Sequence, residues 1–88
     1  RNTEKLADLA SETVARTVAL DGSDTNGVDA LFSSISGRLD VAIYNPSARQ
    51  RGPIADLDPE EVRRAIEITA FGSFLMGQAA AKMMQSQP

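Results

Sequence analysis

The sequence has no cysteine and no histidine among its 88 residues. These absences exclude a disulfide scaffold, a thiol nucleophile, a zinc finger and a Ser-His-Asp triad within the chain. The net charge is -3 and no basic residues cluster, so we expect neither a nucleic-acid surface nor a membrane-binding surface. We predict no metal site.

Long apolar runs are also missing. No run approaches the ~18 residues that a membrane span needs, and no cationic leader precedes an apolar segment. We therefore expect a cytoplasmic protein. The hydrophobic fraction of 42% is ordinary, and 88 residues make one small domain at most. The chain begins at Arg1 in a helix-like pattern without an initiating Met and ends in another such pattern, so we expect the middle of a longer protein.

The most informative stretch runs from Leu39 to Ser47. Residues 39–44 are almost wholly apolar and rich in β-branched or aromatic side chains, which predicts a central strand. The strand should stop at the next two residues, because Pro46 cannot donate to a ladder and Asn45 tolerates turn conformations. A buried parallel strand that ends in a small polar turn is where open α/β sheets bind ligands.

Two elements are predicted before this strand. Asn2 or Thr3 can cap a first helix with an apolar face. Residues 14–20 are rich in β-branched side chains and of mixed polarity, which predicts a strand at or near a sheet edge. One long helix over residues 2–20 is the alternative.

Two more helices complete the pattern. After a turn at residues 21–24, a second amphipathic helix is predicted, with Gly37 where a left-handed C-cap is wanted. Asp58 and Pro59 are a strong start for a last helix, which can run to about Met84. The order α-β-α-β-α predicts the α/β fold class, with a parallel sheet and covering helices.

Four stretches follow one another in a recognisable order and cover essentially the whole chain. They are RNTEKL at residues 1–6, DGSD at 21–24, LDVAIYNPSA at 39–48 and GSF at 72–74. This pattern resembles the short-chain dehydrogenase/reductase family. The resemblance implies that residues 1–88 are part of a doubly wound Rossmann-type nucleotide-binding domain, without its first two strands and its catalytic C-terminal part.

The resemblance also implies an activity. The parent protein would be an NAD(P)-dependent oxidoreductase that moves a hydride between nicotinamide and the carbon of a small carbonyl or alcohol. The segment alone would be inactive, because the family's Gly-rich turn and Tyr-x-x-x-Lys are not among its residues. The family's dimerisation helix corresponds to residues 59–84, which implies a homodimer or tetramer. Two rivals stay open: a non-catalytic α/β module that binds a partner through its C-terminal helix, and another nucleotide-binding enzyme such as a methyltransferase.

Contacts with the adenosine half of the cofactor are implied for three residues. Arg1 would lie where the family reads the ribose, and a guanidinium there favours NADP over NAD; a solvated terminal arginine is the alternative. Asp21 and Gly22 match the pair that meets the adenine. Without the resemblance, these two residues would be a simple turn.

The turn at residues 44–47 matches the family's Asn-Asn-Ala-Gly turn, which touches the cofactor riboses. Asn45 is retained, whereas Tyr44, Pro46 and Ser47 depart from the family pattern. Ser47 is still small enough for a close approach to a cofactor. Pro46 has no N–H, so its contact would run through its carbonyl or ring carbons.

Thr69 is the one catalytic candidate. It stands three residues before Gly72, where many family members carry an Asn that orders a proton-relay water. A threonine can hydrogen-bond a water or its own helix backbone. The alternative is a mid-helix threonine that packs in the core.

Overall fold

The computed structural model describes residues 3–87. A 3-10 turn, Glu4–Leu6, leads into the first helix, α1, which spans Ala7–Thr13. The helix ends at Val14, whose φ of 59° lies in the left-handed region. The predicted N-terminal helix is confirmed, and the alternative of a single helix through residue 20 is wrong.

The second helix, α2, spans Thr25–Ser33 and follows the predicted turn. The turn is closed by a hydrogen bond of 2.9 Å from the Asp24 N–H to the Asp21 carbonyl. Gly37 has the expected positive φ, 95°, but it lies beyond Ser34, the residue that caps the helix. Gly37 therefore bends the following loop and does not end α2.

A long helical rod forms the C-terminal part of the chain. It consists of α3 (Pro59–Ile66), a π-helical turn (Glu67–Phe71) and α4 (Gly72–Gln85). Its start is as predicted, because an Asp58 carboxylate oxygen accepts the Glu60 N–H at 3.0 Å. The helix to about residue 84 is thus confirmed, although the sequence did not predict the π-helical turn inside it.

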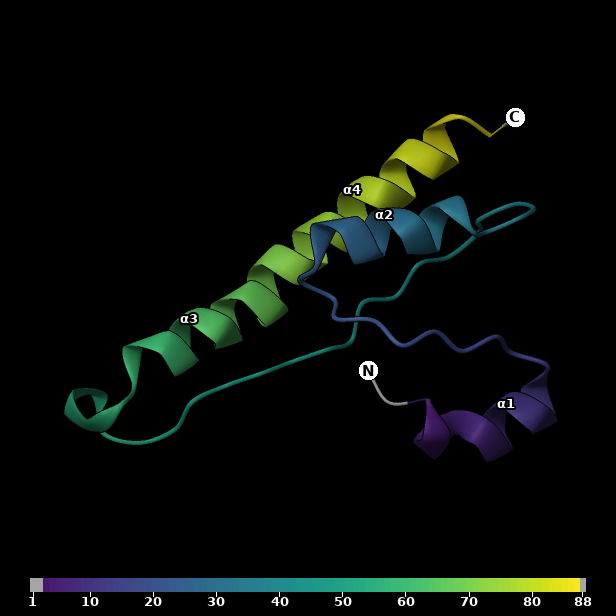
Figure 1. Ribbon diagram of the computed structural model, residues 1–88. Coiled ribbons are helices and arrows are strands. Elements are labelled where there is room, and N and C mark those ends of the chain that lie inside the picture. The colour runs from purple at the N-terminus through teal and green to yellow at the C-terminus, as the bar shows by residue number, and fades with distance from the viewer. Residues whose placement is uncertain (1–2, 88) are drawn as a thin grey trace.

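The buried core lies where α2 packs beside α4, as Figure 1 shows. The buried apolar side chains are Val28 of α2, Leu75 and Ala80 of α4, and, apart from that contact, Ala65 of α3. Figure 1 shows α1 set apart from the rod, and within residues 3–87 it packs on no other α-helix. The radius of gyration is 15.6 Å, whereas a compact domain of this length has about 12 Å. The arrangement is therefore open.

The predicted α/β fold class is wrong, because residues 3–87 form helices, turns and irregular segments but no strand. Residues 14–20 and 39–44 have strand-like compositions and yet join no ladder. A strand exists only when a neighbour supplies N–H and C=O groups, and apolar composition does not provide them. Val41 and Ile43 are accordingly 70% and 79% exposed. None of the helices formed by residues 3–87 is long and apolar enough to cross a membrane.

The side chain of Gln87 takes the place of a strand neighbour at one point. Its amide oxygen accepts the Leu39 N–H at 2.5 Å, and its amide nitrogen donates to the Leu39 carbonyl at 3.0 Å. This pair of bonds ties the end of the rod to the start of the 39–44 segment. A ladder partner would have made the same two bonds.

Candidate functional site

A charged cluster fixes the turn at residues 21–24 against α3. One carboxylate oxygen of Asp21 accepts the Ser23 N–H at 3.0 Å and the Ser23 hydroxyl at 2.8 Å. Arg64 donates to the other oxygen of Asp21, to the Ser23 hydroxyl at 2.7 Å and to Glu67 at 3.2 Å. The hydrogen bonds from Ser23, with help from Arg64, lower the pKa of Asp21 to about 2. Asp21 is therefore ionised at neutral pH.

Tyr44 packs where the turn, the 39–44 segment and the helical rod meet. Its hydroxyl donates to the Ile68 carbonyl in the π-helical turn. A Cβ on Gly22 would lie 2.8 Å from this hydroxyl, and a Cβ on Gly72 would collide with it and lie 3.0 Å from the Gly22 carbonyl. Both glycines are therefore required for the close approach of these three segments.

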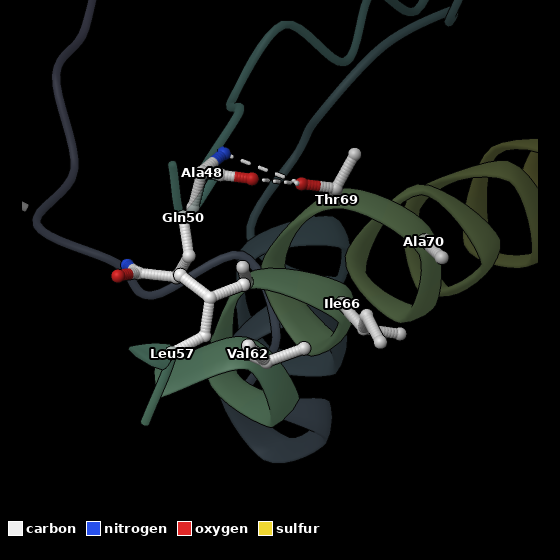
Figure 2. Close-up of a pocket in the computed structure, with 8 residues that line it drawn as sticks. Ala48, Gln50, Leu57, Val62, Ile66, Thr69 and Ala70 are labelled. Carbon is white, nitrogen blue, oxygen red and sulfur yellow. Dashed lines mark hydrogen bonds between the residues drawn. The ribbon is translucent and has the colours of Figure 1, made fainter. Parts of the chain in front are cut away.

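Thr69 lies in the π-helical turn and bonds the backbone of Ala48. Its hydroxyl accepts the Ala48 N–H at 3.2 Å and donates to the Ala48 carbonyl at 3.1 Å, as the dashed lines in Figure 2 show. A hydroxyl has one donor, so Thr69 cannot also donate to a relay water while both bonds hold. The contact ties the irregular segment after residue 44 to the rod.

A groove of about 330 Å³ adjoins this contact. Its lining is mostly apolar and comes from the 48–57 segment and from the rod (Figure 2): Ala48, Gln50, Leu57, Val62, Ala65, Ile66, Thr69 and Ala70. Asn45, Pro46 and Ser47 directly precede Ala48 and are exposed. The segment that carries these three predicted residues is therefore held beside Thr69.

The other predicted residues divide into two groups. Asp21 and Gly22 are half-buried and rest on the rod through Arg64 and Tyr44. Arg1 lies outside the described residues. Residues 64–72 of the rod therefore contact both the 21–22 turn and the 45–48 segment.

The sequence did not predict the site contacts of two residues, Arg64 and Tyr44. Arg64 is 43 positions from Asp21, and no spacing rule connects two charges so far apart. Tyr44 was expected at the end of the predicted strand and as a departure from a family pattern, with no contact assigned to its hydroxyl. The signal that could have found its role is the chain's single tyrosine together with glycines at positions 22 and 72.

The family model described as enoyl-(acyl carrier protein) reductase matches residues 1–88, which is the whole chain. The chain belongs to the short-chain dehydrogenase/reductase family. Proteins of this family generally use NAD or NADP as cofactor.

Two curated relatives of this short-chain dehydrogenase/reductase are oxidoreductases by name. (5R,7aS)-5-hydroxy-7a-methyl-1-oxo-2,3,5,6,7,7a-hexahydro-1H-indene-carboxyl-CoA reductase of Mycobacterium tuberculosis is 30% identical over 90 residues, or 97% of this chain and 34% of that protein. Trans-4-hydroxycyclohexanecarboxylate dehydrogenase of Sinomonas cyclohexanicum is 42% identical over 50 residues, or 57% of this chain and 19% of that protein. The chain thus spans about a third or less of the length of these relatives. No solved structure gives a significant match.

Proposed function

We propose that residues 1–88 are a partial nucleotide-binding domain of an NAD(P)-dependent oxidoreductase. The whole protein transfers a hydride between nicotinamide and a carbonyl or alcohol carbon of a small molecule, and the two relatives' names support this class of substrate. One observation carries the proposal. Two stretches of the family pattern, residues 21–24 and 39–48, are held against the rod that contains the third, residues 72–74, through the Gly22–Tyr44–Gly72 packing and the Thr69–Ala48 hydrogen bonds.

The residue types at the site fit the adenosine and ribose parts of a dinucleotide. Asp21 is anionic at neutral pH, which suits an amino group such as that of adenine and disfavours a phosphate. Tyr44 fills the space beside Gly22, so the backbone of Gly22 is what remains to meet the adenine. The amide of Asn45 and the hydroxyl of Ser47 are neutral groups that suit ribose hydroxyls.

Pro46 completes this turn through its carbonyl or ring carbons, because it has no N–H. When bound, the cofactor supplies the hydride chemistry. The described residues bind and orient it. Arg1, by its place in the sequence, contacts a 2′-phosphate, and this would make NADP the preferred cofactor.

Thr69 acts in this proposal as an anchor of the 45–48 segment. Its only donor is used by the Ala48 carbonyl, which leaves the hydroxyl no proton to pass on. Replacing Thr69 by Val keeps the shape and removes both bonds. A lost hydrogen bond costs about 0.5–1.5 kcal/mol, or about 1–3 kcal/mol for the two, so we expect cofactor affinity to fall by roughly 5- to 160-fold. A drop of turnover well beyond tenfold with unchanged cofactor affinity would instead assign Thr69 to proton transfer, because general acid–base assistance is worth ~10²–10⁴-fold.

The rod also offers a face for self-association. Phe71 and Phe74 are 45% and 56% exposed, and their rings stack at 6.4 Å. We propose that this face joins copies into a homodimer or tetramer, since exposed apolar clusters on a helix mark interaction surfaces. Sedimentation of a Phe74→Glu variant should then show a smaller assembly than the wild type.

Titration of the whole protein with NADP and NAD tests the cofactor proposal. Asp21→Ala removes a charge-assisted contact with the cofactor worth about 1.5–3 kcal/mol, so the Kd of the variant for the cofactor should rise about tenfold or more. Asp56→Ala is the matched control, because Asp56 is an exposed acid in the Ile54–Asp56 turn. Equal affinities of the two variants would refute the role of Asp21. Failure of the wild type to bind either cofactor would favour the non-catalytic partner-binding module.

A further inference from the structure

The rod that carries Thr69 widens for one turn between α3 and α4. In a regular α-helix the Gly72 N–H would donate to the Ile68 carbonyl, four residues back. It donates instead to the Glu67 carbonyl, five residues back, at the end of the π-helical turn. Such turns are rare, and they occur frequently at functional sites.

Tyr44 takes the acceptor that the helix gives up. Its hydroxyl donates to the Ile68 carbonyl, which is the group that Gly72 would use in a regular helix. Burial and the charge of Asp21 raise the pKa of Tyr44, so the hydroxyl keeps its proton at neutral pH. A side chain that inserts into the helical hydrogen-bond ladder is a known cause of local irregularity.

The widened turn has a consequence for the adjoining segment. Thr69 lies within this turn, and one residue corresponds to about 100° of rotation around a helix axis. A return to regular α-helical bonding would therefore change where the Thr69 hydroxyl points. The two hydrogen bonds of Thr69 to Ala48, at 3.1 and 3.2 Å, depend on that direction.

We infer that Tyr44 is a positioning residue, whose hydroxyl holds the helix in the wide turn that brings Thr69 onto Ala48. Through Thr69 it fixes the segment that contains Asn45, Pro46 and Ser47. The structural part of this inference stands on the hydrogen bonds alone. Its effect on cofactor binding rests on the proposed function, in which that segment contacts the riboses.

A crystal structure of the Tyr44→Phe variant of the whole protein tests the structural part. Phenylalanine keeps the ring between the two glycines and removes only the hydroxyl. We expect the Gly72 N–H to return to the Ile68 carbonyl, and the Thr69–Ala48 bonds to be lost. Retention of the Glu67–Gly72 bond together with the Thr69–Ala48 bonds would overturn the inference. Gly72→Ala should remove the same Tyr44–Ile68 hydrogen bond in a second way, because its Cβ would displace the Tyr44 hydroxyl. The same rearrangement of the helix should follow.

Cofactor titration tests the functional part separately. Tyr44→Phe and Thr69→Val should raise the Kd of the cofactor by the same factor within about twofold, and the double variant should be no weaker than either, because coupled residues are not additive. Ser73→Ala is the control: its hydroxyl donates to Ala70 within the same rod at 3.0 Å, and its removal should change neither the wide turn nor the Kd. Multiplying effects in the double variant would contradict the coupling. If the wide turn is lost but no variant changes the Kd, the positioning of Thr69 is upheld and the proposed ribose contact is refuted.

Discussion

Two glycines of the same rod should respond in opposite ways to substitution by alanine. At an ordinary helix position, alanine in place of glycine gains about 0.5–1 kcal/mol. Gly77 is such a position, because it is exposed and a Cβ there would meet nothing within 4 Å. Gly72 has helical backbone angles as well, with φ −61° and ψ −40°, but it is buried.

A Cβ at Gly72 would meet one side-chain group and one backbone group. The Tyr44 ring carbon bearing the hydroxyl would be 2.8 Å away, and the Gly22 carbonyl 3.0 Å away. Overpacking of this kind costs about 1–3 kcal/mol, and loss of the Tyr44–Ile68 hydrogen bond costs about 1 kcal/mol more. These costs exceed the gain in helix propensity, so Gly72→Ala should lower the free energy of unfolding by roughly 1–3 kcal/mol.

Urea unfolding of the whole protein measures both variants. Gly77→Ala should unfold at a slightly higher urea concentration than the wild type, and Gly72→Ala at a clearly lower one with the same slope. If Gly72→Ala were as stable as Gly77→Ala, the packing of Tyr44 between the two glycines would be refuted.

Three further predictions concern charge, cofactor choice and autonomy. The pKa of the Asp21 carboxyl is about 2 in the folded protein and 3.8 in its absence, so the ionised carboxylate stabilises the fold above pH ~4, and this contribution disappears as the pH falls through about 2. The difference in unfolding free energy between the wild type and Asp21→Asn should therefore shrink over that range. A constant difference would contradict the lowered pKa. Replacing Arg1 by a neutral residue should weaken NADP more than NAD, by more than about tenfold, whereas equal effects on both cofactors would make Arg1 a surface residue. The 88-residue chain alone should unfold without a sharp transition, because Val41 and Ile43 are largely exposed and the buried core is small; a sharp, reversible melt of the monomer would count against a partial domain.

Local signals predicted the helices well. Asp58 and Pro59 define the start of α3 through a capping bond and a preset φ, and these are properties of neighbouring residues. The turn at 21–24 was likewise predictable from its own residues. Elements whose hydrogen-bonding partners lie within a few positions of each other in the sequence could therefore be predicted from local residue chemistry.

Local signals predicted two strands that residues 3–87 do not form, and they did not reveal the contacts of the site. Residues 39–44 have the composition of a buried strand, but composition does not supply the neighbouring chain that a ladder requires. The Arg64–Asp21 pair and the contact of Tyr44 with the rod join residues 43 and 24 positions apart. Side-chain bonds over such separations follow from tertiary packing, which the sequence pattern does not encode directly.

Hydrogen–deuterium exchange of the whole protein with and without saturating NADP tests the central proposal most directly. Backbone amides are protected where a ligand orders or covers them. Peptides that contain residues 21–22 and 45–47 should exchange more slowly with cofactor present, while the exposed 3-10 turn at residues 54–56 should not change. Unchanged exchange at both the 21–22 turn and the 45–47 segment, under conditions where NADP binds, would contradict the assignment of this chain as the adenosine- and ribose-binding part of the enzyme.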